Sequence, residues 1–122
     1  MSLPKRGDVV LVLFPNSDLV TIKARPALVV QSDRATTDLP QILVVAITSQ
    51  MFRAGYPSRM VVLAESSIGR VAGLLTDSVI IADNIVTVET SDIARIIGTL
   101  PMNLIDPVNL IDPALRYVLE LP

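Results

Sequence analysis

The sequence of 122 residues has the length of one domain, residues 1–122, and a net charge of −2. Hydrophobic residues make up 51% and aromatic residues only 3%, so a core must be aliphatic, which favours β-strands. The sequence has no His and no Cys, which excludes disulfides, thiolate zinc sites and acid–base chemistry by histidine. No apolar run reaches the ~20 residues of a transmembrane helix and no signal peptide is visible, so we expect a cytoplasmic protein without a membrane partner.

The charges are unevenly distributed along the chain. Residues 23–70 contain six Lys and Arg against three Asp and Glu, whereas residues 71–122 contain two against seven. A basic middle can face a polyanion while the acidic end faces away. Scattered solvated charges are the alternative interpretation.

Seven short apolar runs follow one another, each bounded by Pro, Gly, Asp, Asn or Ser. They are residues 9–14, 27–30, 42–47, 60–64, 78–82, 85–88 and 93–97. Short strands with frequent turn signals are typical of a small sandwich or barrel.

Helical signals are confined to the end of the chain. Asp112 is a suitable N-cap and Pro113 fits the first helical position, which predicts a short closing helix over residues 114–120. The phrase at residues 103–107 recurs at residues 109–113, and we expect its first copy to form a helical turn or a loop entry.

Two polar segments lie at the edges of runs that should be buried. Residues 23–27 (Lys-Ala-Arg-Pro-Ala) precede one run, and residues 47–50 (Ile-Thr-Ser-Gln) end another. A guanidinium and two hydroxyls at strand ends can converge on an anion such as a phosphate. Taken alone, each segment is more often an exposed charge or a plain strand end, so the hypothesis depends on their joint occurrence.

These pieces occur in a characteristic order. They are residues 7–12, Phe14-Pro15 with Asp18, residues 23–30, residues 47–50, Gly55-Tyr56-Pro57, residues 78–84 and residues 95–98. In this order they resemble the PemK/MazF-like toxin family of type II toxin–antitoxin systems.

The resemblance implies a mainly β fold, an SH3-like small β-barrel with a short C-terminal α-helix. It implies a homodimer that binds single-stranded RNA, such as mRNA, along its groove and cuts it sequence-specifically as an endoribonuclease without metal or other cofactor. It also implies a cognate antitoxin protein whose disordered tail fills the RNA groove. Operator DNA would be reached only indirectly, through the antitoxin.

Metal-free RNA cleavage can use the substrate's 2′-hydroxyl as nucleophile, which leaves a 2′,3′-cyclic phosphate and a 5′-hydroxyl end. Arg25 suits stabilisation of the phosphorane, because its guanidinium is permanently charged and can bind two oxygens at once. Thr48 can donate a hydrogen bond to the scissile phosphate, and Ser49 either assists or closes the strand. The resemblance carries the family's catalytic Arg and Thr onto Arg25 and Thr48.

Asp83 is the third catalytic candidate and the best general base in a chain without His. One branch of the family has an Arg two residues before this Asp, where this sequence has Ile81. Residues two apart on a strand share a face, so Ile81 takes the place of that Arg. Alternatively, Asp83 caps a turn with Asn84. Asp18 is a weaker candidate base.

Further side chains are predicted to contact the RNA. Tyr56 can stack on a base or brace the turn around it, and the cationic residues can bind the backbone with salt-dependent affinity. The predicted RNA contacts are Asp18, Lys23, Ser49, Gln50, Arg53, Tyr56 and Arg59.

Two other functions are compatible with such a fold, since fold does not fix function. One is a non-catalytic toxin that binds a protein target, as in a gyrase-poisoning branch. The other is a decayed member kept as a regulatory binding module. Arg25 together with Thr48 favours the ribonuclease, because a protein-binding barrel does not need that pair.

Overall fold

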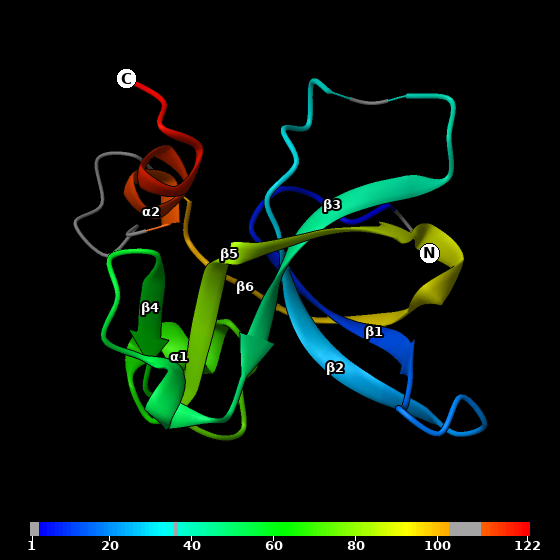
Figure 1. Ribbon diagram of the computed structural model, residues 1–122, viewed down its shortest axis with the longest axis horizontal. Coiled ribbons are helices and arrows are strands. Elements are labelled where there is room, and N and C mark those ends of the chain that lie inside the picture. Colours follow the sequence, from blue (N-terminus) through cyan, green and yellow to red (C-terminus); the bar gives the residue numbers. More distant parts are fainter. Residues whose placement is uncertain (1–2, 36, 103–110) are drawn as a thin grey trace.

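The computed structural model describes residues 3–35, 37–102 and 111–122. Six antiparallel strands form one sheet in the order β4-β5-β3-β2-β1-β6 (Figure 1). The strands are β1 (Asp8–Pro15), β2 (Ile22–Val29), β3 (Gln41–Thr48), β4 (Arg59–Val62), β5 (Ser78–Glu89) and β6 (Ile93–Thr99). The helices are α1 (Ser67–Val71) and α2 (Ile111–Leu119), and the short 3-10 turns are η1 (Met51–Arg53) and η2 (Thr90–Asp92).

The expected fold class, mainly β with a short C-terminal helix, is confirmed. The sheet is strongly bent but not closed, because β4 and β6 are its edges and no pairing joins them within the described residues. Helix α2 packs against β5 and β4 at one end of the sheet (Figure 1). Helix α1 was not predicted; it begins after Ser66, whose hydroxyl accepts a hydrogen bond from the Gly69 amide at 3.0 Å.

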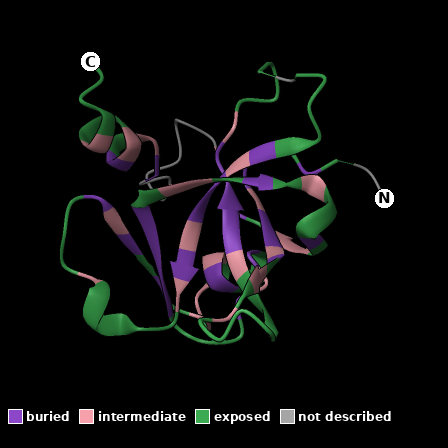
Figure 2. Ribbon diagram, turned by 45° about the vertical axis from the view of Figure 1, so that its right-hand side comes forward, coloured by how far each residue is buried: buried purple, intermediate pink, exposed green. Residues whose placement is uncertain are grey.

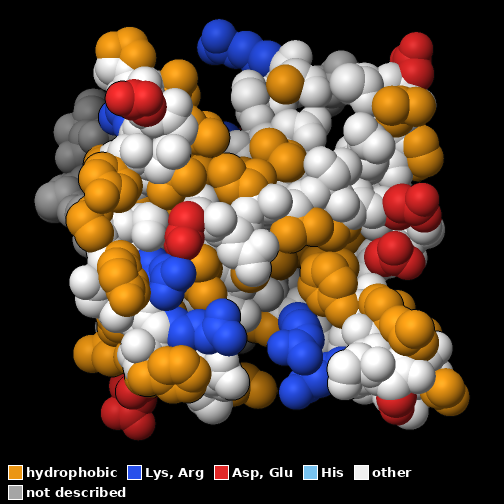
Figure 3. Space-filling model, viewed as in Figure 1, with side chains coloured by type: hydrophobic (Ala, Val, Ile, Leu, Met, Phe, Trp, Pro, Cys, Tyr) orange, Lys and Arg blue, Asp and Glu red, His pale blue; other side chains and the backbone are white. Residues whose placement is uncertain are grey.

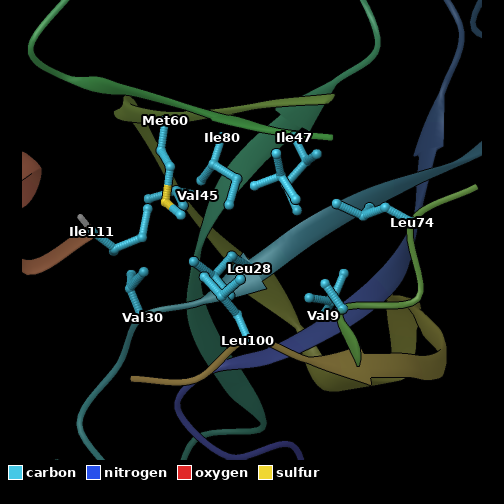
Figure 4. Packing of buried hydrophobic residues seen from close by; sticks show 12 residues of the cluster. Val9, Leu28, Val30, Val45, Ile47, Met60, Leu74, Ile80, Leu100 and Ile111 are labelled. Carbon is cyan, nitrogen blue, oxygen red and sulfur yellow. The ribbon is translucent and has the colours of Figure 1, made fainter. Parts of the chain in front are cut away.

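Both faces of the central strands are buried. On one face of β3, Val45 and Ile47 pack in the larger core with side chains from β1, β2, β4 and α2 (Figure 4). On the other face, Ile42 and Val44 pack in a smaller core formed with β1, β2, β5 and β6. Figure 2 shows the consequence: buried residues fill the middle of the strands, while the hairpin tips and η1 are exposed.

The runs at residues 78–82 and 85–88 were expected as two strands, and this was wrong. They form the single strand β5, which is irregular where Val45 pairs with Ile85 and the next residue, Ala46, pairs with Ile81. The residues between, 82–84, have no partner on β3 and form a bulge. Asp83 and Asn84 therefore interrupt the pairing without ending the strand.

The predicted closing helix is present but starts earlier than expected. Helix α2 already includes Ile111, so Asp112 lies in its first turn and is not the N-cap. The Asp112 carboxylate instead forms an ion pair with Arg6, which ties the start of the chain to the helix. Ile111 is completely buried in the larger core, and its burial explains the earlier start. The expectation for residues 103–107 lies outside the described residues.

Gly98 is the point where α1 packs on β6. A Cβ atom at this position would overlap the backbone of Ala72 and Val71 at the end of α1.

Gly98→Ala should lower the free energy of unfolding by about 1–3 kcal/mol, because the helix must move away from the strand. Urea denaturation measures this. The control Ala94→Ser, at an exposed position of the same strand, should change stability by less than about 0.5 kcal/mol. Equal midpoints for the two variants would contradict the contact.

Candidate active site

Arg25 and Thr48 meet where two strands separate. The ladder between β2 and β3 ends at the pair Ala27–Ala46, and extending its register by two residues places Arg25 opposite Thr48 on the same face. Pro26 has no amide hydrogen and cannot donate a ladder hydrogen bond at this point. Beyond the last pair the strands diverge, as Figure 1 shows, and Arg25 and Thr48 line the same cavity.

This cavity has a volume of about 330 Å³. Its polar lining consists of Arg25, Thr48, Gln50, Arg53 and Asn84, and its apolar lining of Phe14, Pro26, Ala27, Val44, Ala46, Ile47, Ile81 and Val86. Figure 3 shows Lys and Arg side chains on two sides of a hollow, over β2 on one side and over β4 and the preceding segment on the other. An apolar floor with converging cations and hydrogen-bond donors suits a small anionic ligand.

Arg25 and Thr48 both have hydrogen-bond donors available to bind a ligand. Arg25 is exposed and makes no ion pair with any described residue. The Thr48 hydroxyl oxygen accepts a hydrogen bond from the Gln50 amide at 3.1 Å. Because a hydroxyl has one donor hydrogen and two acceptor lone pairs, Thr48 still has its proton to donate into the cavity.

Lys23 and Ser49 flank this cavity without lining it. Lys23 is exposed on β2, two residues before Arg25 and therefore on the same face. Ser49 lines a neighbouring cavity of about 630 Å³, together with Arg95 and several apolar side chains. Pro26 lines both cavities, so the two lie next to each other.

Asp83, the third catalytic candidate, does not line the cavity of Arg25 and Thr48. Its carboxylate binds the Arg59 guanidinium through two hydrogen bonds, 3.1 and 3.0 Å long. These bonds from Arg59 hold the pKa of the Asp83 carboxyl below its ordinary value, with a smaller contribution from the Ser58 hydroxyl. The alternative prediction, a turn at Asp83 and Asn84, is wrong because β5 continues through both residues.

The remaining predicted residues form two groups. Gln50 and Arg53 line the cavity, whereas Arg59 does not. The Arg59 guanidinium contacts Tyr56, with its central carbon 4.8 Å from the centre of the Tyr56 ring. Asp18 lies in the hairpin between β1 and β2 and accepts hydrogen bonds from the Val20 and Thr21 amides and from the Thr21 hydroxyl. Of these bonds, the Thr21 amide contributes most to lowering the pKa of the Asp18 carboxyl.

Sequence reasoning missed two features of the site. Asn84 lines the cavity, but an Asp-Asn pair in sequence indicates only a turn. The pairing of Arg59 with Asp83 joins residues from two strands and needs the register of β4 and β5, in which Arg59 lies opposite Ile81. Within the described ranges, no cluster of three or more carboxylates could hold a metal ion, and no helix is long and apolar enough to cross a membrane.

Solved structures of known proteins resemble this chain in fold. An endoribonuclease in complex with its cognate antitoxin, from a mycobacterial species, is 26% identical with a TM-score of 0.68, over 98% of this chain and 97% of that chain. The Mycobacterium tuberculosis toxin MazF-mt6 is 25% identical with a TM-score of 0.69, over 94% and 98% of the two chains. A MazE–MazF structure from Deinococcus radiodurans, at 19% identity and a TM-score of 0.70 over 100% of both chains, shows the shared fold alone.

No curated protein sequence matches the chain at a significant level. A family model does: that of the PemK-like, MazF-like toxins of type II toxin–antitoxin systems matches residues 5–111. This match spans most of the chain and includes every strand and the whole cavity. The protein therefore belongs to the family of PemK-like, MazF-like toxins of type II toxin–antitoxin systems.

Proposed function

We propose that this protein is a sequence-specific, metal-independent endoribonuclease that cuts single-stranded RNA such as mRNA. The observation that carries the proposal is that Arg25 and Thr48 line one cavity, where, among the described residues, Arg25 has no ion-pair partner and the Thr48 hydroxyl donates no hydrogen bond. Two mycobacterial structures similar to this chain, at 26% and 27% identity, are endoribonucleases, which supports the same activity here.

In the proposed reaction, the 2′-hydroxyl oxygen attacks the adjacent phosphorus and the bond from phosphorus to the 5′-oxygen breaks. The products are a 2′,3′-cyclic phosphate and a 5′-hydroxyl end. Negative charge grows on the non-bridging oxygens of the phosphorane as the new bond forms. Arg25 can bind two of these oxygens through its fork of N–H groups, and Thr48 can donate a third hydrogen bond.

Two protons move in this reaction: one leaves the 2′-hydroxyl and one reaches the departing 5′-oxygen. None of the described residues that line the cavity is a carboxylate, so these side chains supply anion stabilisation rather than a base. Arg25 is exposed, so water reaches the phosphate and can exchange both protons. Arg25 and Thr48 are the proposed catalytic residues, and Asp83 has a different proposed role.

The RNA backbone is proposed to run from β2 across the cavity to η1. Lys23 and Arg53 are exposed cations on the two sides, and neither forms an ion pair with a described residue. Tyr56 contacts Arg59 and is 61% exposed, which leaves its ring accessible to a base. Asp18 accepts hydrogen bonds from the Thr21 amide and hydroxyl, which stabilise the hairpin between β1 and β2. Its proposed effect on RNA binding is to hold this hairpin in place.

The proposal includes a partner protein and a cellular location. A mycobacterial endoribonuclease similar to this chain is in complex with its cognate antitoxin, and we propose that a cognate antitoxin binds this toxin as well. Any link to operator DNA would then run through the antitoxin. A homodimer remains part of the proposal, as does a cytoplasmic location, where mRNA is available.

Arg25→Ala should abolish RNA cleavage and leave the fold intact, because the charge on the phosphorane would be uncompensated. The assay incubates a long RNA with the protein in EDTA and maps the new ends, expecting discrete cuts with 5′-hydroxyl termini. Arg34→Ala, which removes an equally exposed cation outside the cavity, should cut normally. Cutting by Arg25→Ala would remove Arg25 from catalysis, and a wild type that cuts nothing would favour a toxin that binds a protein target.

Thr48→Val keeps the shape of the side chain and deletes its hydroxyl. We expect cleavage to slow by about 10²-fold, the effect of losing one donor to the developing oxyanion. Thr48→Ser retains a hydroxyl and is the matched control, which should stay close to the wild-type rate. Single-turnover rates on a short RNA measure both, and an unchanged rate in Thr48→Val would assign Thr48 a structural role only.

RNA binding should weaken steadily as salt rises. A filter-binding titration with an RNA carrying a 2′-deoxy substitution at the cut position separates binding from cleavage. Each lost phosphate contact should reduce the slope of log K against log salt by about 0.7, so Lys23→Ala and Arg53→Ala should each have a shallower slope than the wild type. A flat response in the wild type would exclude a basic RNA path.

A further inference from the structure

We propose that Asp83 is a positioning residue: through Arg59 it fixes the segment of residues 50–58 against the bulge of β5, and so sets which RNA sequence the cavity accepts. This inference rests on the proposed ribonuclease function for its effect on RNA. Its structural part, the fixing of the segment by one ion pair, stands independently of that function.

The ion pair has the geometry of a two-point attachment. The Arg59 Nε donates to one Asp83 carboxylate oxygen at 3.1 Å, and the terminal nitrogen Nη2 donates to the other at 3.0 Å. The Arg59 side chain is 19% exposed and that of Asp83 is 38% exposed, so the pair is partly shielded from water. Two parallel hydrogen bonds fix the plane of the guanidinium as well as its distance.

The same guanidinium holds two points of the segment that follows β3. Its other terminal nitrogen, Nη1, donates to the Arg53 carbonyl oxygen at 2.8 Å, at the end of η1. Its central carbon, Cζ, lies over the Tyr56 ring, 4.8 Å from the ring centre. Arg59 thus connects the bulge of β5 with η1 and with the turn at Tyr56.

The bulge of β5 presents this carboxylate to Arg59. Residues 82–84 have no partner on β3, and the Ala82 amide instead donates to the Ser58 carbonyl oxygen at 2.9 Å, next to Arg59. A regular strand would alternate its side chains strictly between the two faces. The bulge breaks that alternation: Ile81 and Asn84, three residues apart, both line the cavity, whereas Asp83, which a regular strand would place on the face of Ile81, binds Arg59 outside it.

The segment held in this way forms one wall of the active-site cavity. Gln50 and Arg53 line the cavity, and the Gln50 amide also donates to the Thr48 hydroxyl. A shift of this segment would move an RNA-binding cation and the donor that orients Thr48. The attachment therefore controls the shape of the cavity on the side away from β2.

A role in positioning fits the state of the carboxylate better than proton transfer. Both oxygens of Asp83 are already bonded to Arg59, and those bonds lower the pKa of its carboxyl. Asp83 lines a different, open cleft with Arg116, Tyr117 and Glu120 near α2 and the end of the chain, not the cavity of Arg25 and Thr48. A weak base outside the cavity is poorly suited to take the 2′-hydroxyl proton.

The test compares Asp83→Asn, Arg59→Gln and the double variant on a short RNA and on a long RNA with many sites. Each single variant should raise KM about tenfold, change kcat less than about threefold, and cut at additional sequences. The double variant should be no worse than either single one, because both remove the same attachment. Asp83→Glu, which keeps a carboxylate, should recover part of the loss.

Matched controls are Asp92→Asn on η2 and Arg70→Gln on α1, both exposed and outside the cavity. They should behave as the wild type. The proposal would be overturned, and proton transfer assigned to Asp83, if Asp83→Asn lowered kcat by about a hundredfold or more at unchanged KM while Arg59→Gln stayed near wild type. Additive losses in the double variant would overturn it as well.

A measurement without RNA separates this inference from the proposed function. The Arg53, Ala54 and Arg59 amides donate within the segment, to Gln50, Met51 and Tyr56, and they report its order in hydrogen exchange. Asp83→Asn should speed their exchange about threefold or more and leave the buried amides of β3 unchanged. Unchanged exchange at all three amides would overturn the attachment even if the wild type cuts RNA. A wild type that cuts no RNA would refute the proposed function and leave this part standing.

Discussion

The burial of both faces of β2 and β3 is the constraint on which the rest of the structure depends. The two cores share these strands, so no polar side chain can be placed along their paired length without losing its hydration. The two strands therefore change to polar residues only beyond the end of this ladder, at Arg25 and Thr48, two residues past the pair Ala27–Ala46. The strands diverge at that point beside a cavity with an apolar floor, and the first polar residues after the ladder belong to its lining.

An arginine that is paired with a carboxylate has a structural role in this protein, whereas an arginine without one is available to bind a ligand. Arg6 is bound to Asp112 and closes the start of the chain onto α2, and Arg59 is bound to Asp83 and orders the segment after β3. Arg25 has no such carboxylate among the described residues, so its charge remains uncompensated at the cavity. A guanidinium cannot lose its proton under ordinary conditions, so the presence or absence of an acidic neighbour decides its role.

Much of the fold and half of the site were accessible from the sequence. Apolar runs located the strands, and the joint occurrence of Arg25 and Thr48 predicted one anion site; the structure places both residues in the lining of one cavity. Errors arose where a local signal competed with burial. Asp83 and Asn84 signalled a turn but form a bulge, because β5 is paired with β3 on both sides of them. Asp112 signalled a cap but lies inside α2, because Ile111 fits the larger core.

The sequence by itself determined the class of structure, the family and Arg25 with Thr48 as the candidate pair, because these depend on periodicity and on the order of short segments. Only the tertiary structure decided which arginines are paired with a carboxylate among the described residues. Arg25 and Arg59 are the same residue type in the sequence. They differ because the register of β4 and β5 places the Asp83 carboxylate next to Arg59. Contacts between residues 24 positions apart depend on how the whole sheet bends, and no local pattern contains that information.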